Sequence, residues 1–82
     1  MPWQPRLTWA DHALKQMRYR RITKTHVRAV LASPVNMAPS PVGRNRIEVT
    51  GLSGHPGRRI TVIIEPFTKT TRVITAYLPK TS

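Results

Sequence analysis

The sequence predicts an α+β domain in which two N-terminal helices pack on one face of a three- to four-stranded antiparallel sheet. Residues 8–33 repeat apolar side chains at helical spacing, residues 44–79 alternate apolar and polar side chains as strands do, and a proline-rich connector at 34–43 separates the two parts. A chain of 82 residues has room for one domain, which we place at 1–82.

The first helix is expected at about residues 9–20, after an irregular lead-in at 1–7 in which Trp3 folds back on the body. Thr8 is a candidate N-cap, and Asp11 lies three residues later, where a carboxylate completes a capping box. The apolar stripe of this helix follows i, i+3, i+4, i+7 spacing and consists of Ala10, Ala13, Leu14 and Met17.

The second helix is expected at about residues 24–32, with Thr23 as its N-cap and Pro34 as its stop. Together with the first helix it forms a predicted helical hairpin over 8–33. The connector that follows contains three prolines and has room for a short edge strand near 35–37.

The predicted sheet is a meander of three strands, the first at about 45–52 and the other two within Arg58–Leu78, where the turn Pro66–Thr70 joins them. Strand residues alternate between the faces of a sheet. In the last strand this places Ile74, Ala76 and Leu78 on the helix-covered side and Val73, Thr75 and Tyr77 on the other. The residues expected on the uncovered face are Arg46, Glu48, Thr50, Arg59, Thr61, Thr75 and Tyr77.

The charge balance is strongly basic. Fourteen Lys and Arg face three Asp and Glu, which leaves a formal charge of +11, and ten of the fourteen are Arg. Arginine makes planar bidentate contacts with phosphate, so RNA or another nucleic acid is the first candidate partner. An acidic protein is the second. The chain lacks cysteine, a membrane-spanning apolar run and a signal-peptide core, so we expect a cytoplasmic protein without a membrane partner.

The motifs exclude several kinds of chemistry. The three histidines do not have metal-ligand spacing, the carboxylates are too few for a two-metal nuclease, and no phosphate-binding glycine loop is present. We therefore expect no metal or other cofactor. The uncovered face suits a phosphodiester, because Arg59 and Arg46 can neutralise a phosphate and Tyr77 can stack on a base or donate a proton. The alternative is an ordinary solvated sheet face.

The first helix contributes a second group of candidates. On a helical wheel His12 lies almost opposite the apolar stripe, and histidine is suited to proton transfer near neutral pH. A surface histidine without a role is the alternative. Arg18, Arg20 and Arg21 form a basic patch beside Tyr19 that extends a candidate RNA-binding surface.

Four motifs, in their order and spacing, resemble an uncharacterised family of small domains. They are HALKQMRYRRI, ITKTHVRAVLASP, RRITVII and RVITAY, and they cover about residues 8–78. That family is assigned to the superfold shared by barnase, EndoU, colicin ribonucleases and RelE-type toxins. The resemblance implies two helices against a three- or four-stranded antiparallel sheet, and RNA cleavage. Gln16 departs from it, because the family pattern has an arginine there.

The sequence thus predicts a metal-independent endoribonuclease, in its most specific form the toxin of a toxin–antitoxin pair. Arg59 and Arg46 hold the phosphate, His12 moves the proton, with Glu48 as the alternative base, and Thr75 and Tyr77 position the substrate. Two other functions stay open: a non-catalytic nucleic-acid-binding module, and an interaction domain for an acidic antitoxin or immunity protein.

Overall fold

The computed structural model describes residues 3–41, 43–53 and 58–79, and within these ranges it contains two helices and one five-stranded sheet. The α+β class is as predicted. The elements, in chain order, are β1 (Leu7–Trp9), α1 (Asp11–Tyr19), α2 (Lys24–Ala32), β2 (Pro34–Pro39), β3 (Ile47–Ser53), β4 (Arg58–Pro66) and β5 (Thr71–Tyr77).

The sheet is larger than predicted and mixed, with the strand order β1-β5-β4-β3-β2. The meander β3–β4–β5 is antiparallel, as expected. The connector supplies a full antiparallel edge strand, β2, and the expected lead-in supplies β1, which runs parallel to β5. The predicted turn at 53–57 lies largely outside the described residues.

The N-terminal segment is fixed by the start of β5. The hydroxyl of Thr71 donates to the Gln4 carbonyl at 2.7 Å, and the Thr71 amide donates to the Arg6 carbonyl at 2.8 Å. Trp3 does fold back, and only 5% of it is exposed. Because residues 7–9 are extended in this pairing, Thr8 belongs to a strand and does not cap α1; the residue before the helix is Ala10, without a side-chain cap.

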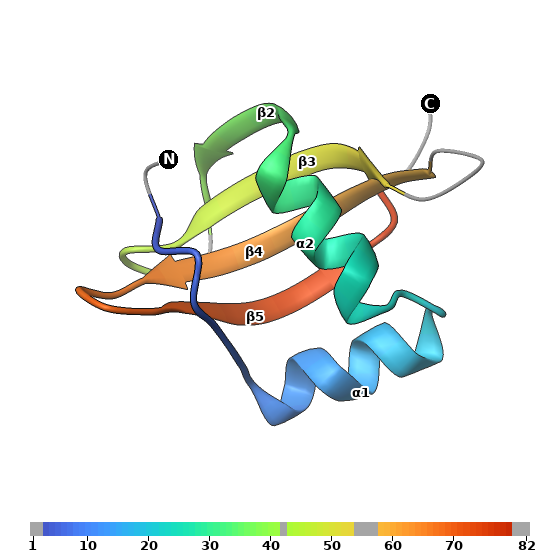
Figure 1. The fold of residues 1–82 in the computed structure, drawn as a ribbon, viewed down its shortest axis with the longest axis horizontal. Coiled ribbons are helices and arrows are strands. Elements are labelled where there is room, and N and C mark those ends of the chain that lie inside the picture. The colour runs from blue at the N-terminus through green and yellow to red at the C-terminus, as the bar shows by residue number, and fades with distance from the viewer. Residues whose placement is uncertain (1–2, 42, 54–57, 80–82) are drawn as a thin grey trace.

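The two helices lie at different places on the sheet and do not form the predicted hairpin over one face. Figure 1 shows α2 in front of β3 and β4, whereas α1 lies below the β5 edge, next to the strand it contacts most. The capping prediction for α2 is confirmed: Thr23 Oγ1 accepts from the His26 amide, and His26 Nδ1 accepts from the Thr23 amide, both at 3.1 Å.

The core lies between α2, α1 and the inner face of the sheet. Its fully buried strand residues are Val49, Ile60, Val62, Ile64, Val73 and Ala76. A register shift corrects the predicted alternation in β5, because Ile63 pairs with Thr75 whereas Ile64 pairs with Val73. Ile74 is the extra residue of this bulge, so Val73 and Ala76 both reach the core, although they are an odd number of positions apart. Leu78 is 44% exposed, not buried as predicted.

Gly51 allows α2 to approach β3 closely. A Cβ atom at this position would lie 3.2 Å from the Ser33 carbonyl oxygen and 3.2 Å from Val30 Cγ1. We expect Gly51→Val to lower the free energy of unfolding by about 1–3 kcal/mol, because the added methyl groups force α2 away from the sheet. Urea unfolding measures this effect. Leu52→Val, at the exposed neighbouring position, is the control and should change stability by less than about 0.5 kcal/mol.

Candidate functional site

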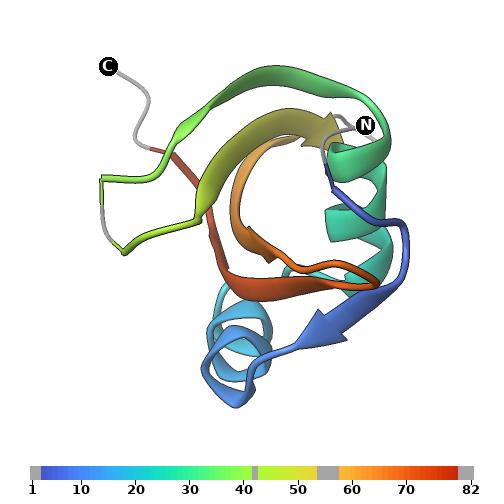
Figure 2. The ribbon, with the colours of Figure 1, turned by 90° about the vertical axis from the view of Figure 1, so that its left-hand side faces the viewer.

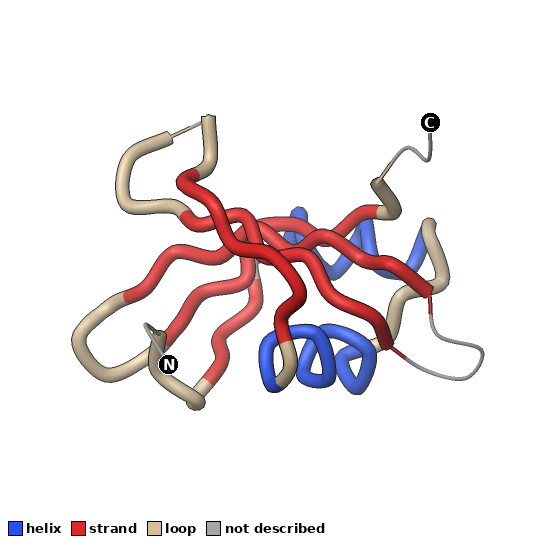
Figure 3. The backbone as a smooth tube through the Cα atoms, turned by 90° about the horizontal axis from the view of Figure 1, so that it is seen from above, coloured by secondary structure: helices blue, strands red, loops and turns tan. Residues whose placement is uncertain are grey.

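The outward face of the sheet, meaning the face of β3, β4 and β5 turned away from α2, carries four rows of paired side chains. Along the strands these rows are Leu52–Arg59, then Thr50–Thr61–Tyr77, then Glu48–Ile63–Thr75, and finally Glu65–Arg72–Thr8. Arginines therefore stand at both ends of the face, and the carboxylate of Glu48, the hydroxyls and the phenol stand in the middle rows. Figures 2 and 3 show that the β2–β3 connection and the end of β5 project on this same side.

The middle of the outward face is sheltered from solvent. Thr61 is only 2% exposed, although it points away from the helices, and its hydroxyl lies 2.9 Å from that of Thr50. Neighbouring side chains must therefore cover it, since neither α1 nor α2 lies on this side. A plain solvated sheet face would leave a central threonine open to water.

Tyr77 and Glu48 interact across this sheltered centre. Burial raises the pKa of the Tyr77 phenol above its ordinary value of 10.0, and the negative charge of Glu48 raises it further. The two side chains are thus close enough for one charge to act on the other, although their strands are separated by β4. At neutral pH the phenol of Tyr77 is protonated.

This interaction predicts a measurable titration. In Tyr19→Phe protein Tyr77 is the remaining tyrosine, and its phenolate absorbance should appear above pH 10. Adding Glu48→Gln should lower the pKa, because the repelling charge is removed while burial remains. Adding Glu65→Gln instead is the control and should leave it unchanged. The pKa of Tyr77 is higher in the folded state than in the unfolded state. The free energy of unfolding should therefore fall as the pH rises from the unfolded-state pKa through the folded-state pKa.

Arg46 is less available than the sequence suggested. Its Nε lies 3.6 Å from Glu65 Oε2, and both side chains are partly buried. That distance makes an ion pair but not a hydrogen bond, and Nε is otherwise without a partner. Gly43, at a φ of +86°, leaves room for the Arg46 side chain to lie against the loop. The predicted phosphate ligand is therefore already paired with a carboxylate.

Arg59 and Arg72 differ in the charges around them. Arg59 is exposed, its cross-strand partner is Leu52, and the described residues provide it with no ion pair. Arg72 stands directly opposite Glu65, the carboxylate that also forms the ion pair with Arg46. Sequence reasoning did not place Arg72 on the outward face. Glu65 shares that face with Ile63 by strand alternation, and the length of the β4–β5 turn sets Arg72 opposite Glu65, so these two features could have predicted its position. Arg59 is the unbalanced cation of this face.

Comparison with known protein families identifies one family that matches the chain. A family described as a domain of unknown function, DUF4258, matches residues 9–78, which run from the end of β1 past the end of β5. The chain belongs to the DUF4258 family. No curated protein and no solved structure matches it.

In this DUF4258 domain His12 lies apart from the middle rows of the outward face. It is an exposed residue in the first turn of α1, which begins beside Val73, where the Ala10 amide donates to the Val73 carbonyl at 3.1 Å. No hydrogen bond or ion pair to another described residue orients its side chain. The structure thus separates His12 from the carboxylate and phenol with which it was expected to act.

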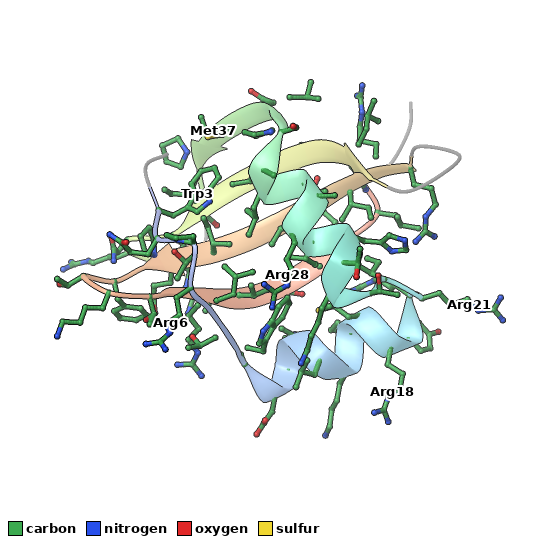
Figure 4. The ribbon with its side chains drawn as sticks, viewed as in Figure 1. Trp3, Arg6, Arg18, Arg21, Arg28 and Met37 are labelled. Carbon is green, nitrogen blue, oxygen red and sulfur yellow. The ribbon has the colours of Figure 1, made fainter. Side chains whose placement is uncertain are left out.

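The three arginines expected to extend the RNA-binding surface have different environments in the DUF4258 domain. Arg20 is partly buried, and its Nη1 donates to the Ala76 carbonyl at 3.2 Å, which satisfies the β5 edge beyond β1. It is therefore a structural residue. Arg18 and Arg21 are exposed and point away from the body at the end of α1 (Figure 4). Only these two remain free to bind phosphate.

Three further findings complete the description of the DUF4258 domain. The described part of the DUF4258 domain holds no group of three or more His, Cys, Asp or Glu side chains that could bind a metal ion. No helix in the described ranges is long and apolar enough to cross a bilayer. His26, for which the sequence suggested no role, is a capping residue of α2, a position normally occupied by glutamate or glutamine.

Proposed function

We propose that this protein is a small endoribonuclease that works without a metal ion on the outward face of its sheet. One observation carries the proposal. A carboxylate, a protonated phenol and a sheltered pair of hydroxyls occupy adjacent rows, with arginines in the rows on either side. Cleavage of RNA by its own 2′-hydroxyl needs a proton acceptor, a proton donor and a cation at the phosphate.

Glu48 is the proposed base. Its carboxylate takes the proton from the 2′-hydroxyl as that oxygen attacks the adjacent phosphorus. Tyr77 is the proposed acid, because its phenol is protonated at neutral pH and stands in the row next to Glu48, where it can give its proton to the departing 5′-oxygen. The bond from phosphorus to the 5′-oxygen breaks, and the products are a 2′,3′-cyclic phosphate and a free 5′-hydroxyl. Arg59 stabilises the charge that develops on the phosphate oxygens.

The geometry favours Glu48 over His12 as the base. Glu48 stands in the row next to Tyr77 and acts on its pKa, whereas His12 stands on α1 without a hydrogen-bond partner among the described residues. A base and an acid must reach opposite sides of one phosphate, so two groups on the same rigid sheet are better placed than one on a helix beside it.

The resemblance to the barnase and RelE superfold supports the same reading, since it implies RNA cleavage and an antiparallel meander after two helices. The formal charge of +11 supports a polyanionic substrate. In the toxin form of the proposal an acidic antitoxin neutralises this charge.

The proposal is tested by incubating the purified protein with a mixed-sequence RNA in excess EDTA. We expect fragments with 2′,3′-cyclic phosphate ends, and no cut at a site whose 2′-hydroxyl is replaced by hydrogen. Cleavage that requires added Mg²⁺, or that also occurs at the deoxy site, would contradict this mechanism. Tight, salt-sensitive binding without products would instead identify a non-catalytic RNA-binding module.

A further inference from the structure

One face of α1 is exposed along its whole length and has an unusual composition. Its residues follow i, i+3, i+4, i+7, i+8 spacing, line a shallow hollow, and are Asp11, Leu14, Lys15, Arg18 and Tyr19. We call this surface the α1 platform. Tyr19 is 86% exposed, and Leu14 is 38% exposed although its spacing predicted a place in the core. Leu14 and the Tyr19 ring are therefore exposed to water, with the cations Lys15 and Arg18 between them in the sequence.

The charge of the molecule is concentrated on the helices and the segment before β1, not on the outward face. The exposed cations there are Arg6, Lys15, Arg18, Arg21, Lys24 and Arg28, against the single carboxylate of Asp11. The outward face holds three arginines and two carboxylates. The exposed Arg44 of the β2–β3 connection adds a further cation on this side, but the excess of cations over carboxylates is still larger on the helices, so a polyanion is attracted mainly to the helices.

The C-terminal end of α1 lies beside the end of β5. Arg20 donates to the Ala76 carbonyl, and each partner is followed or preceded by an aromatic residue: Tyr19 comes just before Arg20, and Tyr77 comes just after Ala76. One hydrogen bond thus joins the side chain of Arg20, the residue after Tyr19, to the backbone carbonyl of Ala76, the residue before Tyr77. A ligand lying along α1 can continue onto the sheet at this point.

We propose that the α1 platform binds single-stranded RNA that leads into the outward face, an inference that rests on the proposed function. A base stacks on the Tyr19 ring, and Lys15, Arg18 and Arg21 hold the neighbouring phosphates. Sequence-tolerant binding of single strands combines a cationic track with exposed aromatic side chains in this way, whereas a duplex keeps its bases out of reach of such a ring.

An acidic protein partner fits this surface less well. A stable protein interface needs about 800 Å² from each partner, with an apolar core. The α1 platform offers Leu14 and Tyr19 as its apolar residues, and they lie at opposite ends of a set that is otherwise charged. Cations around one open ring match alternating phosphates and bases better than a protein core.

The experiment measures the binding of an RNA single strand of about eight nucleotides to full-length Glu48→Gln protein, which prevents turnover. Tyr19→Leu should weaken binding about tenfold or more, because it keeps apolar area but loses stacking, and Tyr19→Phe should bind as the parent does. Tyr19 is outside the core, so neither change threatens folding. Arg18→Gln should reduce the slope of log K against log salt by about 0.7, the value for one phosphate contact on a single strand.

The outcomes separate this inference from the proposed function. If Tyr19→Leu binds RNA as tightly as Tyr19→Phe, the platform assignment is wrong, whether or not the unmodified protein cleaves. If Tyr19→Leu weakens binding but the unmodified protein never cleaves, the platform stands and the nuclease proposal falls. Poly-glutamate that binds more tightly than the RNA, with the same dependence on Tyr19, would overturn RNA as the occupant.

Discussion

Glu48→Gln is expected to slow RNA cleavage by about 10²–10⁴-fold, the range associated with one general acid–base group. The substitution keeps the shape of the side chain and removes its ability to accept the proton of the 2′-hydroxyl. RNA binding should be retained, because a negative charge facing the phosphate is lost. Single-turnover cleavage of an end-labelled RNA measures the rate, and binding of the uncleavable 2′-deoxy analogue measures the affinity.

Two variants control this result. Glu65→Gln removes the other carboxylate of the outward face, which is paired with Arg46, and should change the rate far less. His12→Ala removes the histidine on α1 and should leave the rate within a few-fold of the parent. If His12→Ala abolishes cleavage while Glu48→Gln does not, the base has been assigned to the wrong element, and α1 must approach the substrate more closely than the structure shows.

The alternation of β3 and β4 could be predicted because each is antiparallel on both sides and buried on one face. Val49, Ile60, Val62 and Ile64 are in the core, as their period of two requires. The bulge at Ile74 was not predictable from β5 alone, since nothing in Val-Ile-Thr-Ala distinguishes a bulged residue from a paired one. It moves Val73 to the core yet leaves Thr75 and Tyr77 outward, so the error did not disturb the candidate site.

The position of α1 on the sheet could not be predicted, because it depends on β1. A three-residue strand such as Leu7–Trp9 is too short to show a period, and its partner is more than sixty residues away in sequence. Once β1 occupies the start of the β5 edge, α1 continues along that edge instead of stacking beside α2. The expected role of His12 rested on its place on a helical wheel and that of Arg20 on a run of arginines, and neither feature fixes where α1 lies against the sheet. The roles of Glu48, Thr75 and Tyr77 rested on strand alternation.

Arg59→Gln is expected to lower kcat for RNA cleavage by about 10²–10³-fold, the effect of removing one donor from a developing charge. The Arg59 charge is not offset by a carboxylate, because Leu52 is its cross-strand partner. KM should rise much less, since most of the cations that attract RNA lie on the helices. The kcat of Arg59→Lys should lie between that of the parent and that of Arg59→Gln, because lysine keeps the charge but lacks the planar guanidinium that matches a phosphate.

Arg72→Gln is the matched control, since it removes an exposed arginine from the same face at a position directly opposite Glu65. If Arg59→Gln and Arg72→Gln lower kcat equally, both arginines act only through the overall electrostatic field of the protein. Added salt should then remove the difference in kcat between each variant and the parent. If Arg59→Gln alone reduces kcat at both low and high salt, Arg59 touches the reacting phosphate. That pattern would place the scissile bond between the Arg59 row and the Glu48 row, above the sheltered hydroxyl of Thr61.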